Sequence, residues 1–80
     1  MSKVYKIELK NGYYLFKLEE VLEKKKVSKN KIMRDTNTDF KVIQRISKGN
    51  LNRIDIDVMD RLCDYLDCNW NDIIEYRKNS

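Results

Sequence analysis

The stretch that most constrains this chain runs from Ser28 to Gly49 and reads SKNKIMRDTNTDFKVIQRISKG. Its pattern predicts two short helices separated by a turn. Ser28 is a suitable N-cap for the first helix, because its hydroxyl can accept from a free backbone N–H. This helix is expected to turn Ile32 and Met33 inward and to end at about Arg34.

A polar segment, residues 35–38, interrupts the helical pattern. Asn37 is the residue there that best tolerates a positive φ, because its short polar side chain can bond its own backbone. Asp39 is expected to cap the second helix, which buries Ile43 and Ile46 and ends at the closing glycine, a common C′ residue. This is the spacing of a helix-turn-helix.

The predicted packing leaves one face of the second helix outside, with side chains at i, i+3, i+4 and i+7: Lys41, Gln44, Arg45 and Lys48. Lysine and arginine can donate to guanine, and glutamine can pair with adenine. The face therefore suits contact with base edges in a DNA groove. The solvated face of any surface helix shows the same periodicity, so the spacing alone does not decide between the two.

The charge distribution favours DNA. The net charge is +4, but residues 1–50 carry 13 Lys/Arg against 6 Asp/Glu, whereas residues 51–80 carry 4 against 7. The basic half contains the predicted helix-turn-helix, which is where a phosphate-binding surface needs its cations.

The length of 80 residues indicates one domain. The absence of proline and the presence of only two glycines favour helices. No apolar run is long enough to cross a bilayer and no leader precedes the chain, so a cytoplasmic protein is expected.

The sequence gives little support for catalysis or metal binding. There is no histidine and no Gly-rich phosphate loop, so we expect no catalytic residues and no enzyme activity. Cys63 and Cys68 are expected to be reduced, small apolar residues. Asp57, Asp60 and Asp64 share a helical face but do not match a calcium loop, and we expect no metal and no cofactor.

Residues 3–10, KVYKIELK, alternate between apolar and polar positions, which predicts a strand. Asn11-Gly12 follows and is a strong hairpin signal. Because a lone strand is unstable in water, it needs either a hairpin stub at Tyr13-Tyr14 or the same strand of a second subunit. A frayed N-terminal arm is the remaining alternative.

The next segment, YYLFK, has high β propensity, and a return strand is one reading of it. Apolar residues nevertheless recur there at helical spacing: Leu15, Leu18, Val21 and Leu22. We therefore expect a first helix from about Leu15 to Lys25. The neighbouring aromatics Tyr13, Tyr14 and Phe16 suit core filling and a dimer interface equally.

Two more helices are predicted after the helix-turn-helix. Asp55 is expected to cap the fourth helix, whose inward stripe is Ile56, Met59, Leu62, Cys63 and Leu66. Asn69 and Asp72 resemble the capping box of a fifth helix that continues to Tyr76, with Trp70 closing the core. The expected domains are an N-terminal strand or arm over 1–14, a helix-turn-helix domain over 15–77 and a tail over 78–80.

The order of these segments resembles the Cro/C1-type (XRE-like) helix-turn-helix domains of bacterial and phage regulators. The residues that carry the resemblance are LEEVLEKKKVSK, TNTDFKVIQRISKGN, IDIDVMDRLCDYLDC and DIIEY, from about Leu18 to Tyr76. The resemblance implies an all-α, compact five-helix lambda-repressor-like DNA-binding domain, here with a short N-terminal β-strand extension. It also implies a dimeric regulator, usually a repressor, that binds double-stranded DNA.

The resemblance also assigns roles to residues. The helix over about 39–48 would enter the major groove and read bases with Phe40, Lys41, Gln44 and Arg45. The residues placed to touch phosphates would be Lys29, Lys48 and Asn50. The sequence departs from the family pattern at Asn37 and Lys26, where glycine is usual, and at Phe40, which is usually polar and could instead turn inward.

Two functions from different classes follow. The first is a sequence-specific regulator that binds DNA as a homodimer, with the strand from Val4 to Leu9 as one route to the dimer. The second is a protein-interaction module on the same fold, such as a phage anti-repressor or an antitoxin-like adaptor. The apolar Phe40 and the unexplained N-terminal strand motivate this alternative.

Overall fold

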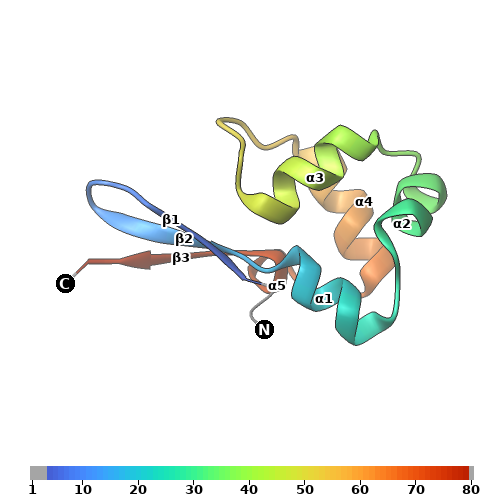
Figure 1. Cartoon of the computed structure of the whole chain (residues 1–80), viewed down its shortest axis with the longest axis horizontal. Coiled ribbons are helices and arrows are strands. Elements are labelled where there is room, and N and C mark those ends of the chain that lie inside the picture. The colour runs from blue at the N-terminus through green and yellow to red at the C-terminus, as the bar shows by residue number, and fades with distance from the viewer. Residues whose placement is uncertain (1–3, 80) are drawn as a thin grey trace.

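The computed structural model describes residues 4–79 and contains, within that range, five helices and three strands (Figure 1). In chain order these are β1 (Tyr5–Glu8), β2 (Gly12–Phe16), α1 (Leu18–Lys25), α2 (Lys29–Thr36), α3 (Phe40–Lys48), α4 (Ile56–Leu66), α5 (Trp70–Ile73) and β3 (Ile74–Lys78). Lys3 of the predicted strand and Ser80 of the predicted tail lie outside the described residues. None of the helices in residues 4–79 combines the length and apolar character needed to span a membrane.

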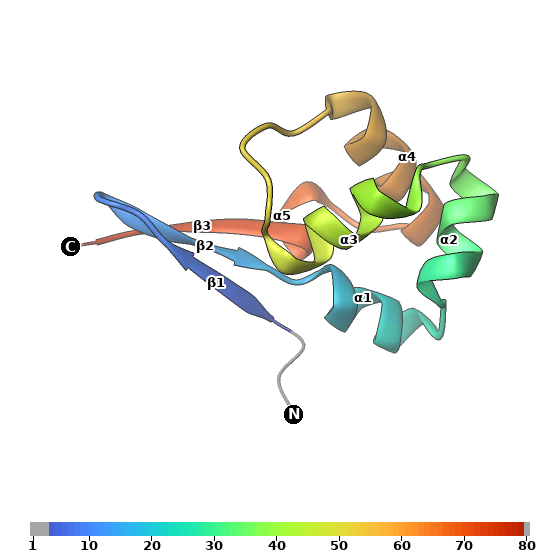
Figure 2. The same cartoon turned by 45° about the horizontal axis from the view of Figure 1, so that its top comes forward.

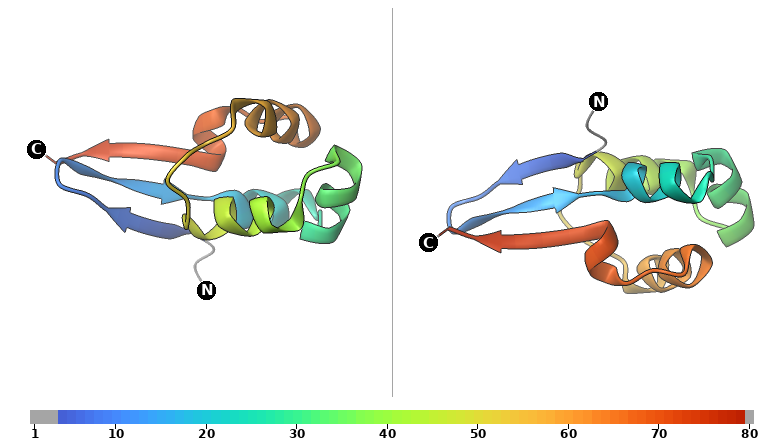
Figure 3. Two further views of the ribbon diagram at one scale, coloured as in Figure 1. Left: turned by 90° about the horizontal axis from the view of Figure 1, so that it is seen from above. Right: turned by 90° about the horizontal axis from the view of Figure 1, so that it is seen from below.

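The expected all-α fold is wrong, because the chain also forms a three-stranded antiparallel sheet in the order β1-β2-β3 (Figure 3). The ends of two predicted helices are strands instead: Leu15 and Phe16, expected to begin the first helix, belong to β2, and residues 74–76, expected to end the fifth helix, belong to β3. Phe16 pairs with Ile74, and Tyr14 with Tyr76. Each segment has a β-forming composition, and each finds its partner at the other end of the chain, so tertiary pairing overrides the local helical spacing.

The predicted hairpin forms, and β1 has β2 as its partner within the chain. The turn lies one residue earlier than expected, because the N–H of Leu9 donates to the carbonyl of Gly12 (2.8 Å), which leaves Lys10 and Asn11 at the tip. Gly12 itself belongs to β2, where a Cβ would collide with the carbonyl oxygen of Arg77 in β3. Position 12 therefore requires glycine, because β3 approaches it too closely for any side chain.

The helices enclose the core, and the sheet projects from one end of the helical body (Figure 2). The inner end of the sheet contributes Phe16 and Ile74 to this core. The other buried apolar residues come from the helices: Leu18, Val21, Leu22, Ile32, Ile43, Ile46, Val58, Met59, Leu62, Leu66 and Ile73.

Most helix ends match their predicted signals. The Ser28 hydroxyl accepts from the N–H of Lys31 (3.0 Å), and Asn69 and Asp72 form the capping box of α5. Asn37 ends α2 with a φ of 53°, as expected. Lys26 ends α1 with a φ of 58°, so the left-handed residue forms there without the glycine that is usual in the family.

Two predicted core residues are exposed instead. Ile56 is 71% exposed and Trp70 is 38% exposed. Each is the first residue of its helix, directly after the cap, and the following turns of α4 and α5 supply the buried residues Met59 and Ile73. Extending the apolar stripe of a helix back to its cap therefore predicts burial for a first-turn residue that is in fact exposed.

An ion-pair group ties β3 to the residue before α1. The carboxylate of Glu75 accepts from Lys17 Nζ (2.8 Å) and from Arg77 Nε (2.8 Å). These two cations lower the pKa of Glu75 from 4.5 to about 2.

Glu75→Gln is expected to change the acid dependence of unfolding. Because the pKa of Glu75 is lower in the folded chain, its ion pairs stabilise the fold fully above about pH 4.5, and this stabilisation is lost as the pH falls toward 2. Urea unfolding from pH 7 to pH 2 should show the difference between wild type and variant shrinking in that window. A difference that stays constant down to pH 2 would contradict the role given to Glu75.

Candidate nucleic-acid interface

The rotation of α3 about its axis is fixed by its ends and its buried side. Asp39 accepts from the N–H of Lys41 (2.8 Å), and Gly49 ends the helix with a φ of 74°. Ile43 is fully buried and Ile46 is 3% exposed. Since both isoleucines point into the core, the opposite side of α3 faces solvent.

The turn between α2 and α3 is held by buried polar groups that the sequence analysis did not find. The N–H of Thr38 donates to the carbonyl of Met33 (3.0 Å), and the hydroxyls of Thr36 and Thr38 lie 2.9 Å apart. Arg61 of α4 reaches the Thr38 hydroxyl (3.3 Å). The angle between α2 and α3 is thereby supported from a third helix.

The structure brings the predicted base-reading residues to the solvent side of α3. Lys41 and Arg45 are exposed, and neither forms a salt bridge within the described chain. Gln44 lies between them and is half-buried. Phe40, in the first turn, is 37% exposed, so it lies at the edge of this surface rather than in the core.

Lys29 at the start of α2 contacts Gln44 directly. Its ammonium donates to Gln44 Oε1 (2.5 Å) and to Glu19 Oε2 in α1 (3.1 Å). A lysine can only donate, so the Gln44 carbonyl faces Lys29 and its NH₂ group is left to face outward. Sequence reasoning missed Glu19, because the contact joins three separate helices.

The remaining predicted phosphate contacts lie at the C-terminal end of α3. Lys48 is exposed, and its Nζ lies 5.9 Å from the ring centroid of Tyr5 in β1. The N–H of Asn50 donates to the carbonyl of Arg45 (3.0 Å). Lys48 follows Lys41 and Arg45 at helical spacing, and Asn50 lines the same groove as Arg45.

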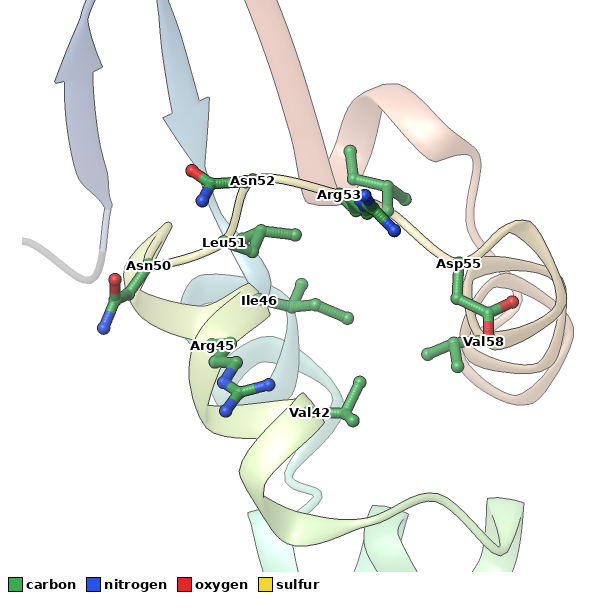
Figure 4. Close-up of a pocket in the computed structure, with 10 residues that line it drawn as sticks. Val42, Arg45, Ile46, Asn50, Leu51, Asn52, Arg53, Asp55 and Val58 are labelled. Atoms are coloured by element: carbon green, nitrogen blue, oxygen red, sulfur yellow. The ribbon is translucent and has the colours of Figure 1, made fainter.

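A groove of about 650 Å³ follows α3 on the side of the α3–α4 loop (Figure 4). The lining includes two arginines, Arg45 and Arg53, and its apolar part comes from Val42, Ile46, Leu51, Ile54 and Val58. Arg53 was absent from the predicted site because the path of a loop is not encoded in a helical period. Arg53 comes from the α3–α4 loop and lines the same groove as Arg45 of α3 (Figure 4).

Cys63 and Cys68 are both half-buried free thiols. Burial raises the pKa of Cys63, and it raises the pKa of Cys68 to about 11, so both thiols are protonated at neutral pH. Within residues 4–79, no group of three or more Cys, Asp or Glu side chains is arranged to hold a metal ion.

Comparisons with known proteins agree with this fold. The family model for the Cro/C1-type HTH DNA-binding domain matches residues 17–79. A crystal structure of the transcriptional regulator VanUg superimposes with a TM-score of 0.67 at 19% identity, over 91% of this chain and 96% of that chain. The family model begins after β2, whereas the structural match is too extensive to leave out the whole hairpin. A search of curated proteins finds no match.

Proposed function

The chain belongs to the family of Cro/C1-type helix-turn-helix DNA-binding domains, and we propose that it is a sequence-specific transcriptional regulator, acting as a repressor. The single observation that carries the proposal is the exposure of Lys41 and Arg45 on the side of α3 opposite Ile43. Unpaired cations on the exposed side of a helix suit a groove lined by phosphates and base acceptors. Such a regulator is expected to act in the cytoplasm.

In this proposal α3 enters the major groove and its residues divide into two groups. The first group reads bases: Phe40, Lys41, Gln44 and Arg45. The second group holds the phosphate backbone: Lys29, Lys48 and Asn50, to which we add Arg53 because it lines the groove beside Arg45. Two copies on adjacent half-sites about one helical turn apart complete the complex.

The geometry of Gln44 refines the expected base. Since Lys29 occupies one side of the Gln44 carbonyl, the free NH₂ group favours an acceptor, such as guanine O6 or N7 or thymine O4. Adenine, the usual bidentate partner of glutamine, requires the carbonyl as well. The carbonyl oxygen has a second lone pair, so adenine is read best when Lys29 turns from Gln44 to a phosphate.

The alternative, a protein-interaction module, depended partly on an N-terminal strand without a partner. That strand pairs with β2, so this motive no longer applies. Phe40 remains partly exposed, but it lies beside the cationic surface, where a thymine methyl group is a suitable contact.

Binding to duplex DNA of random sequence tests the proposal. Lys48→Ala should weaken binding to all sequences alike and reduce the slope of log K against log salt by about 0.9, because one phosphate contact is lost. Lys78→Ala, at the far end of the sheet, is the matched control and should leave the slope unchanged. Fluorescence anisotropy at several salt concentrations measures both.

Two outcomes would contradict the proposal. Equal effects of Lys48→Ala and Lys78→Ala would show that binding follows net charge rather than the α3 surface. No binding at micromolar protein and low salt would favour the protein-interaction alternative.

A further inference from the structure

Backbone N–H and C=O groups along the outer edge of β1 are oriented to pair with another strand. β1 lies at one edge of the sheet, and no strand among residues 4–79 covers its outer side (Figure 3). Leu9 and Gly12 share a backbone hydrogen bond, and hydrogen-bonded pairs alternate along an antiparallel ladder. The backbone groups of Ile7 therefore face β2, whereas those of Lys6 and Glu8 face outward.

We propose that this edge binds β1 of a second copy of the chain, antiparallel, with the two Ile7 residues opposite each other on a twofold axis. In this register Lys6 lies opposite Glu8 of the other copy, and Tyr5 lies opposite its Leu9. Lys6 and Glu8 form the hydrogen-bonded pairs, which agrees with the direction of their backbone groups. The interface is isologous, as twofold symmetry requires.

Charge selects this register over its neighbours. Lys6 and Glu8 lie on one face of β1, with side chains 51% and 74% exposed and 3.3 Å apart. A shift of the axis to Lys6 would place two Lys6 ammonium groups opposite each other. A shift to Glu8 would oppose two carboxylates. Only the axis at Ile7 gives opposite charges at both positions.

The other face of the paired strands would be apolar. Ile7 is 36% and Leu9 56% exposed, and both border a groove of about 560 Å³ that also includes Leu51 and Ile54. Pairing at the axis would place the second Ile7 beside the first and Tyr5 beside Leu9. It would thus extend this apolar surface across both copies and remove part of it from water.

β3, the other edge of the sheet, is less suited to the same contact. The carboxylate of Glu75 is already bound to Lys17 and Arg77, each at 2.8 Å. Its side chain is only 29% exposed, against 51% for Lys6 and 74% for Glu8, so its charge is less accessible to a second chain. β1 also lies beside the C-terminal end of α3, since Gly49 packs against Ile7 and Phe16. A β1–β1 contact would consequently fix the separation of the two α3 helices.

Charge reversal tests the register, in the absence of DNA, by sedimentation equilibrium. Lys6→Glu and Glu8→Lys each place two like-charged pairs across the axis and should weaken the dimer roughly tenfold. Mixing the two variants should restore association as a heterodimer, because every cross-axis pair is then opposite in charge. The double variant Lys6→Glu/Glu8→Lys should also dimerise as wild type does.

The inference deepens the proposed dimer without depending on DNA binding. A wild-type chain that stays monomeric at 100-fold the concentration used for DNA binding would overturn it and leave the proposed function standing. Single variants that dimerise as wild type does, or a mixture that does not associate, would equally overturn the register.

A cross-link gives an independent readout. Opposite residues in a non-hydrogen-bonded pair have Cα atoms about 4.5 Å apart, within the range of a disulfide. Ile7→Cys should therefore form a covalent dimer when oxidised glutathione accepts the two electrons and two protons of the thiols. Glu8→Cys is the control, since its two copies lie on opposite sides of the axis. Cross-linking of Glu8→Cys as readily as Ile7→Cys would contradict the proposed axis.

Discussion

Ile43→Ala should lower the free energy of unfolding by about 2–5 kcal/mol, the usual cost of removing a fully buried isoleucine side chain. Ile43 has no exposed surface and lies on the side of α3 that faces the core. The loss is a large fraction of the 5–15 kcal/mol that is typical of a domain. Urea unfolding without DNA measures it.

The matched control is Ile56→Ala, which removes the same atoms from a side chain that is 71% exposed. Its effect should stay within about 0.5 kcal/mol. If the two substitutions had equal effects, the rotation of α3 deduced from the burial of Ile43 would be wrong. The outward direction of Lys41 and Arg45 would then have no support.

Arg45→Ala should reduce discrimination at one base pair by about 1–3 kcal/mol, which corresponds to roughly 5- to 150-fold in relative affinity. The Arg45 side chain is exposed, so the free energy of unfolding should hardly change. Titration of a bound site and its single-base variants measures the discrimination. Lys78→Ala serves again as the control.

Gln44→Ala should relax a second base pair, and its effect should be coupled to Lys29. Since Lys29 donates to Gln44 Oε1, Lys29→Ala should alter the preference at the Gln44 position as well as weaken all sequences. The double variant should therefore lose less than the sum of the two single losses. A base preference that is unchanged by the variants at Gln44 and Arg45 would contradict the assignment of this surface.

The helix-turn-helix could be predicted from the sequence because its signals are local. Ser28 and Asp39 cap the helices they precede, and Asn37 and Gly49 have the left-handed conformations expected of them. The exposed surface of α3 then follows from the positions of its buried residues. Each of these inferences needs only a few neighbouring residues.

The sheet could not be predicted in the same way. β2 and β3 are separated by the whole helical body, and the residues of each fit a helical spacing as well as a strand. Their pairing depends on a backbone approach at Gly12 that no local pattern reveals. The same reason explains why the contact of Glu19 with Lys29, and the place of Arg53, were not foreseen.

Selection of bound duplexes from a random DNA pool tests most directly whether the exposed side of α3 reads sequence. We expect wild-type protein to enrich an inverted repeat whose half-sites lie about 10 base pairs apart, centre to centre. The positions of strongest preference should be those that Arg45→Ala and Gln44→Ala relax. A bound pool that remains as random as the input would contradict the account.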